Sequence, residues 1–244
     1  MGKVQYWTSC FWLDGILIDT GCAHTAEELL AELRPRGVKL IVNTHYHEDH
    51  VGGNALISRE LNAPIYAPEA SLPLLKDPPW IHAHRELVWG VAEPSRAEAL
   101  GQSLAARGYN FAVHPAPGHC PDQVMLFEKS RGWLFCGDAF IAENPRTGRP
   151  EENYNHWLET VRAMAALEPK VLFCAPLGAV DPALPALQRT LEYLEEMRAR
   201  ILALHGQGLP PERIVQKLFG RESSLIVFTE GQFSYQNFVE AFLK

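Results

Sequence analysis

The chain has 244 residues, of which 47% are hydrophobic and 21% charged, a composition typical of a folded globular protein rather than a disordered or fibrous one. Its formal charge of −7, from 29 acidic and 22 basic residues, disfavours nucleic acid as a partner. No apolar run reaches the roughly 18 residues of a membrane span, and no secretory signal is seen. We therefore expect a cytoplasmic protein with a small-molecule substrate and no membrane partner. The sequence is compatible with a homo-oligomer as well as with a monomer.

The first part of the chain alternates strand patterns with a helix. Thr25 is followed three residues later by Glu28, which is the spacing of a capping box and predicts a helix that ends near Pro35. Asp14-Gly15 predicts the turn of a hairpin. Runs rich in aromatic and β-branched residues predict strands at 4–8, 10–14, 15–20 and 38–44. The last of these strands leads directly into a histidine cluster.

The rest of the chain continues the alternation, which predicts an α/β layered architecture. Further apolar runs predict strands at 111–116, 123–128, 132–138 and 170–176. Helical periodicity predicts helices at 156–167 and 181–205. Residues 71–108 interrupt the strand pattern and predict a helical insertion, with one of its helices after Pro94. Residues 206–244 predict a helical C-terminal appendage that follows a main domain of residues 1–205.

The stretch "HYHEDH" places three histidines and two carboxylates in six consecutive positions. On an extended loop, side chains two apart point the same way, so His45 and His47 can present ring nitrogens to one point. Asp49 and His50 follow at the turn and can serve a second metal roughly 3.5–4 Å from the first. A polar surface loop is the alternative, but histidine is the commonest metal ligand and such a density favours a metal centre.

Two downstream residues extend this candidate metal centre. His119 follows a strand and a Pro-Gly turn in "PAPGHCPDQV", and Asp138 ends the strand in "WLFCGDAF". Together with the cluster they predict a third histidine ligand and a carboxylate that bridges two metals. Cys120, beside His119, is a weaker candidate for a soft ligand.

These motifs resemble the metallo-β-lactamase superfamily over roughly residues 4–180. The family's ordered metal ligands match His45, His47, Asp49, His50, His119 and Asp138. Asp19 in "LIDTG" resembles an early family aspartate that supports a ligand without being one. The resemblance implies a four-layer αββα sandwich with the metal site at one edge of its two sheets, and a catalytic main domain.

One departure from the family pattern concerns the second metal. Two-metal members carry a last histidine after a strand, whereas the corresponding stretch here is "VLFCAPLGAV", with Pro176 at the expected position. Proline offers no ligating side chain. The side of the site formed by His45, His47 and His119 should be intact, and we expect the second metal to bind weakly or not at all.

Other histidines and polar residues near the motifs are weaker candidates. His82 and His84 repeat the two-apart spacing, but no acidic cluster accompanies them, so we expect them in a lid packed by tryptophans. Tyr154 and His156 either touch substrate or begin a helix, for which Asn155 is a suitable N-cap.

The interpretation that follows is a metal-dependent hydrolase of an ester, thioester or lactone. One or two Zn²⁺ ions, with iron or manganese as alternatives, would generate the attacking hydroxide, and Asp49 would orient it or carry its proton. A mononuclear iron oxygenase similar to the persulfide dioxygenases of the superfamily is one alternative. A metal-stabilised binding protein without turnover is another.

Overall fold

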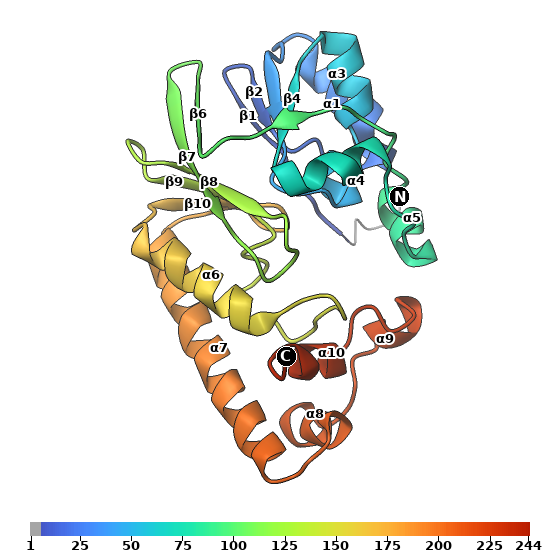
Figure 1. Cartoon of the computed structure of the whole chain (residues 1–244), viewed down its shortest axis with the longest axis vertical. Coiled ribbons are helices and arrows are strands. Elements are labelled where there is room, and N and C mark those ends of the chain that lie inside the picture. The colour runs from blue at the N-terminus through green and yellow to red at the C-terminus, as the bar shows by residue number, and fades with distance from the viewer. Residues whose placement is uncertain (1–5) are drawn as a thin grey trace.

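Two β-sheets lie at the centre of the computed structural model, which describes residues 6–244 (Figure 1). The first sheet has the strand order β1 (Phe11–Leu13), β2 (Ile16–Ile18), β3 (Leu40–Val42), β4 (Ile65–Ala67) and β5 (Glu98–Ala99). The second has the order β11 (Gly178–Val180), β10 (Val171–Cys174), β9 (Trp133–Gly137), β8 (Val124–Glu128), β7 (Tyr109–Pro115) and β6 (Ser103–Ala106). The first sheet is parallel from β2 to β5, and the second is antiparallel except where β9 meets β10.

The sheets pack face to face, because alternate residues of their strands share one apolar core. In β2, Ile16 and Ile18 point into the layer between the sheets, where they join Phe111 and Phe135 of the second sheet. Leu17, between them, points to the opposite face and packs with helices. A strand covered on both faces reads as a continuous apolar run, which is why "ILI" shows no polar alternation.

Helices cover the outer face of each sheet, so the predicted four-layer αββα sandwich is confirmed. On the first sheet lie α1 (Ala26–Leu33) and α3 (Asn54–Leu61), and on the second lie α6 (Tyr154–Ala166) and α7 (Ala183–Gly206). Shorter helices lie between the strands of the first half: η1 (Ala23–Thr25), α2 (Glu48–Val51), η2 (Glu69–Ser71), α4 (Leu72–Lys76) and α5 (Ala83–Trp89). None of the helices within residues 6–244 is long and apolar enough to cross a bilayer.

The C-terminal segment forms α8 (Pro211–Phe219), α9 (Leu225–Phe228) and α10 (Tyr235–Ala241). Helix α10 joins the core of α6 and α7, because Phe238 and Phe242 pack against Tyr154 with ring centroids 4.8 and 5.2 Å away. In Figure 1 the segment returns past α6, and α9 lies on the same side of the molecule as α5. The boundaries drawn at 71–108 and 206–244 remain predictions about domain organisation.

Local details confirm one sequence prediction and correct another. The turn at Asp14-Gly15 is confirmed, with φ of 45° and 95° at its two residues. The capping box at Thr25 is wrong: Thr25 is the N-cap of α1, but its side chain makes no cap hydrogen bond and instead lies 3.4 Å from Cys22 Sγ. The turn of η1 runs directly into α1, and this rotates the Thr25 hydroxyl away from the helix end.

Two further predictions of secondary structure fail. No helix follows Pro94, because residues 98–99 and 103–106 instead become β5 and β6 at the edges of the two sheets. The strand predicted at 4–8 begins outside the described residues, and residues 6–8 do not pair in a sheet.

Candidate metal centre

The histidine cluster lies at the predicted junction of strand and helix, with His45 and His47 on the loop that joins β3 to α2 and Asp49 and His50 on α2 itself. Close backbone packing fixes the end of α2 and the loop that carries His119. A Cβ on Gly52 would lie 2.2 Å from the amide nitrogen of Ala23, and a Cβ on Gly118 would lie 2.5 Å from Cα of Trp157. Only glycine permits such approaches.

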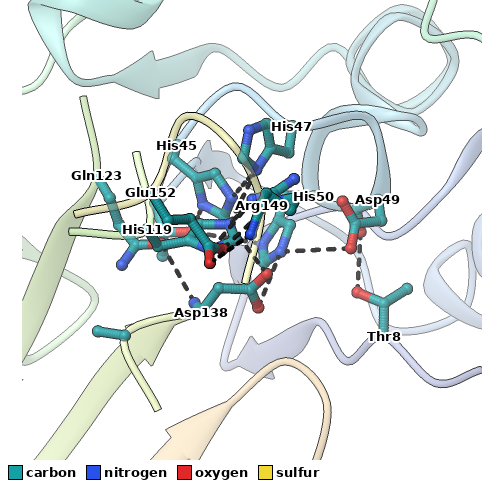
Figure 2. Close-up of polar contacts among 12 residues, drawn as sticks. Thr8, His45, His47, Asp49, His50, His119, Gln123, Asp138, Arg149 and Glu152 are labelled. Atoms are coloured by element: carbon teal, nitrogen blue, oxygen red, sulfur yellow. Dashed lines mark hydrogen bonds and ion pairs between the residues drawn. The ribbon is translucent and has the colours of Figure 1, made fainter. Parts of the chain in front are cut away.

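Three histidine nitrogens converge on one side of the site (Figure 2). His45 Nε2 lies 3.0 Å from His47 Nδ1, which in turn lies 3.0 Å from His119 Nε2. Ligand atoms around a tetrahedral zinc at 2.0–2.1 Å are about 3.3 Å apart, so the three nitrogens are nearly spaced for such an ion. Burial, with nearby cationic groups, lowers the pKa of His45 and of His47 well below the ordinary value, which leaves both rings neutral with free lone pairs.

A carboxylate connects this set with the other side of the site. Asp138 Oδ2 lies 3.3 Å from His119 Nε2, and its Oδ1 lies 3.4 Å from His50 Nε2. Asp49 Oδ2 lies 3.8 Å from the same nitrogen of His50. Burial would raise the pKa of Asp138, but His50 and His119 hold it below the ordinary value, whereas burial raises the pKa of Asp49. The structure thus brings together all six residues that were predicted as ligands.

The donor set fits a metal ion. The ligand atoms of His45, His50 and Asp138 lie within 4.8 Å of one another, as do those of the three-histidine set with Cys120. His50 Nε2 is buried without a hydrogen-bond partner among the described residues, so a cation between it and the carboxylates would satisfy it. Cys120 lies beside the three histidines, and burial raises the pKa of its thiol well above the ordinary value.

Two carboxylates stand behind the histidines and orient their rings. Asp19 Oδ2 lies 2.9 Å from His50 Nδ1, and the same carboxylate accepts hydrogen bonds from the backbone and hydroxyl of Thr44, each at 2.8 Å. Glu152 Oε1 lies 3.1 Å from His119 Nδ1. A proton held on Nδ1 by a carboxylate leaves the lone pair of Nε2 facing the centre. The structure places Asp19 where the sequence predicted it, behind a ligand.

Two residues of the loop between β9 and α6, Arg149 and Glu152, also belong to the site and were not predicted from the sequence. Arg149 Nη2 lies 2.7 Å from His119 Nε2, and Arg149 Nε lies 3.3 Å from Glu152 Oε1. Burial would raise the pKa of Glu152, but the hydrogen bond from His119 and the charge of Arg149 bring it below the ordinary value. The sequence "RPEEN" carries no motif that would have singled out either residue.

The turn after β10 supplies no ligand to the second side of the centre. Ala175 and Pro176 line the same cavity as Asp138, and neither side chain has a donor atom. The alignment of Pro176 with the last family histidine remains a prediction.

The metal centre opens into a cavity of about 430 Å³. Its polar lining comes from the site and from neighbouring residues such as His84 and Arg85. Its larger apolar side chains are Trp7, Val88, Trp89, Ile141, Leu225, Phe228 and Phe233. These apolar residues belong to the N-terminal segment, to α5, to the loop between β9 and α6, and to α9 with the loop that follows it. The insertion and the C-terminal segment therefore both contribute to the wall above the centre.

The weaker candidates divide between this cavity and the rest of the molecule. His84 is 8% exposed and lines the cavity, with no hydrogen bond to either ring nitrogen within the described chain. Tyr154 is buried in the core, where its hydroxyl donates to the carbonyl of Thr147, and it does not reach the cavity. His156 is exposed, and the N-cap of α6 is Asn153 rather than Asn155.

The protein is an αββα sandwich, with two packed sheets between helical layers. Its candidate metal site is a cluster of histidines and aspartates near the ends of β3, β7 and β9. Residues 8–175 match the model of the metallo-beta-lactamase superfamily, and the chain belongs to that superfamily.

Curated relatives of the chain include several enzymes named hydroxyacylglutathione hydrolase. The chain is 32% identical over 120 residues to that of Synechococcus sp. (strain JA-3-3Ab), a match covering 48% of this chain and 41% of the relative. It is 25% identical over 198 residues to that of Pseudomonas fluorescens (strain SBW25), covering 75% and 68%. It is 28% identical over 106 residues to the enzyme of Legionella pneumophila (strain Corby), a match covering 43% of this chain and 35% of the relative. The chain thus spans less than half the length of two of these three relatives.

Solved structures share the fold at lower identity. A metallo-beta-lactamase family protein from Thermus thermophilus superposes with a TM-score of 0.67 at 20% identity, covering 96% of this chain and 85% of that one. TTHA1623 in a di-iron-bound form gives a TM-score of 0.61 at 22% identity, covering 76% and 94%. At these identities the likeness concerns the fold alone.

Proposed function

We propose that this chain is a zinc-dependent hydrolase of esters, thioesters or lactones that carry an apolar arm. The observation that carries the proposal is the convergence of the ring nitrogens of His45, His47 and His119 beside Asp138, at the base of an apolar cavity. The similarity to relatives named hydroxyacylglutathione hydrolase supports hydrolysis as the reaction class.

The residues divide into two ligand sets. His45, His47 and His119 would hold the tighter ion, while Asp49 and His50 would hold a second with a share of Asp138. A divalent metal bound there lowers the pKa of a bound water toward about 7 and polarises a carbonyl oxygen. Behind the ligands, Asp19 and Glu152 keep the Nε2 lone pairs of His50 and His119 directed at the centre.

Asp49 would act as the proton carrier. Its carboxylate lines the cavity, and the Oδ2 atom lies 3.8 Å from His50 Nε2. Burial raises its pKa, which makes it a stronger base toward an attacking water than an exposed aspartate. The apolar wall would exclude bulk water from the reacting carbonyl and hold the apolar arm of the substrate.

Metal analysis with activity measurements tests the proposal. Protein purified without added metal would be assayed by elemental analysis and against a panel of aryl esters, thioesters and lactones. His119→Ala should lose both the metal and hydrolysis, whereas His156→Ala, which changes an exposed histidine outside the cavity, should keep both. Undiminished metal content and turnover in His119→Ala would refute the assignment.

A mononuclear iron oxygenase is the second candidate, and the turn after β10 is the observation that favours it. Ala175 and Pro176 give the second side of the centre no ligand atom, so a single metal would retain open coordination positions for oxygen. Coloured protein with one iron per chain and consumption of dissolved oxygen with a persulfide would favour this candidate over hydrolysis.

A further inference from the structure

Arg149 is a buried cation on the wall of the cavity. Its side chain is 4% exposed, and Figure 2 shows the guanidinium among His47, His119 and Glu152. Withdrawing an arginine from water is costly unless partners satisfy its charge and its five N–H donors. The partners of Arg149 therefore indicate whether the residue serves the fold or a ligand.

The protein satisfies only part of this guanidinium. Nε lies 3.3 Å from Oε1 of Glu152 and 3.3 Å from Oε1 of the exposed Glu151, and Nη2 lies 2.7 Å from His119 Nε2, but Nη1 makes no hydrogen bond within residues 6–244. The charge of Glu152 is also shared, because its oxygens accept from His119 Nδ1 and from the backbone nitrogen of Arg149. On the cavity side, the ring of Phe233 lies 5.7 Å from Cζ.

A second arginine on the same wall provides a comparison, because it has a two-pronged carboxylate partner. Arg85 also lines the cavity, but its Nε and Nη2 form a two-pronged bond with the carboxylate of Glu48, each at 2.7 Å. A two-pronged bond between arginine and a carboxylate is typical of an ion pair that stabilises the fold. Arg149 lacks a two-pronged carboxylate partner, although it is the more buried of the two.

We propose that Arg149 binds an anionic oxygen of the substrate, so that the substrates are esters or thioesters with a carboxylate near the scissile carbonyl and an apolar arm. This inference rests on the proposed hydrolysis for the identity of the reacting group. The guanidinium lies against His119 at the metal centre, and a carboxylate held by it would place the neighbouring carbonyl beside the ligand set. Phe233 would pack against the adjoining carbons.

Two pairs of probes of equal length test the proposal with the metal-loaded protein. Mono-4-nitrophenyl glutarate and 4-nitrophenyl valerate differ by a carboxylate in place of a methyl group, and their kcat/KM values are compared. N-phenylglutaramic acid and N-phenylpentanamide differ in the same way and resist hydrolysis, so their Kd values report binding without turnover. Arg149→Met and Arg149→Lys are the variants, and Arg85→Met is the matched control.

The wild type should prefer the carboxylate member of each pair by roughly 10- to 100-fold, the range for a hydrogen-bonded charge pair. Arg149→Met should abolish the preference, Arg149→Lys should keep part of it, and Arg85→Met should keep it whole. Equal Kd values in the wild type, or a preference that survives Arg149→Met because the metal itself attracts the carboxylate, would overturn the proposal. Absent hydrolysis with an intact Kd difference would refute the proposed function while supporting the role of Arg149.

Discussion

Asp19→Asn is the sharpest perturbation of the second ligand set, because it changes a charge and very little else. Asp19 is 3% exposed and adopts a left-handed backbone with φ of 57°, which asparagine tolerates as well as aspartate. The oxygen of the new asparagine amide can still accept the hydrogen bond from the backbone nitrogen of Thr44. The amide nitrogen, however, would face His50 Nδ1, which lies 2.9 Å from the present carboxylate.

The expected consequence is a change of tautomer at His50. An amide N–H donating to Nδ1 moves the ring proton to Nε2, the atom that lies 3.4 Å from Asp138 Oδ1 and would bind the second metal. Loss of a supporting carboxylate typically lowers metal affinity about 10- to 100-fold. The lost charge-assisted hydrogen bond is worth roughly 1.5–3 kcal/mol. For a protein of this size that corresponds to a fall in Tm of about 3–12 °C.

Stepwise competition with a chromogenic chelator measures the affinity of each metal, and thermal unfolding measures the change in Tm. Asp14→Asn is a matched control, because Asp14 also has a positive φ of 45° but lies exposed in the hairpin turn. The weaker metal of Asp19→Asn should be lost first, while the metal held through His119 stays. Parallel weakening of both metals, or an effect equal to that of Asp14→Asn, would refute the reasoning.

Three further predictions follow from the same geometry. Glu152→Gln removes the carboxylate behind His119 and should weaken the tighter metal about 10- to 100-fold in a chelator competition, and an unchanged affinity would count against a supporting role. Pro176→His adds an imidazole beside Asp138 and should raise the zinc content toward two ions per chain after identical dialysis; equal content in both proteins would mean that the missing ligand lies elsewhere. Phe228→Ala removes apolar wall and should raise KM roughly 10-fold for long acyl esters with little change for acetyl esters, whereas an equal change for both would contradict substrate contact.

The sequence was most informative where the chemistry is local. His45, His47, Asp49 and His50 lie within six consecutive positions after one strand, so their spacing alone predicted that they would meet. His119 and Asp138 were predicted because each lies at a turn after an apolar strand and because their order matches the ligands of the family that the motifs resemble. The alternation of strands and helices likewise predicted the layered fold, since each apolar run has to be buried against another layer.

Features that depend on contacts between distant segments were not predictable in this way. Nothing in the sequence around Arg149 and Glu152 distinguishes them from surface residues, and their roles come only from the loop that brings them to His119. The same limit applies to Phe228, which is more than 170 residues from His45 in the chain (228 against 45) and yet lines the same cavity. Residues 98–106 were mistaken because short edge strands carry little periodicity.

The C-terminal helices are linked to the metal centre through the loop that carries Arg149 and Glu152. Lys244 Nζ donates to the backbone carbonyls of Pro150 and Glu152, and Phe238 packs against Tyr154 directly after this loop. The backbone nitrogen of Gly148, just before Arg149, also donates a hydrogen bond to the carbonyl of Ser234. Contacts on both sides of Arg149 thus come from the same C-terminal segment. Because α9 supplies part of the cavity wall, the C-terminal segment that would contact the apolar arm of a substrate through α9 also holds, through its later residues, the loop of the cation that would bind the anionic group.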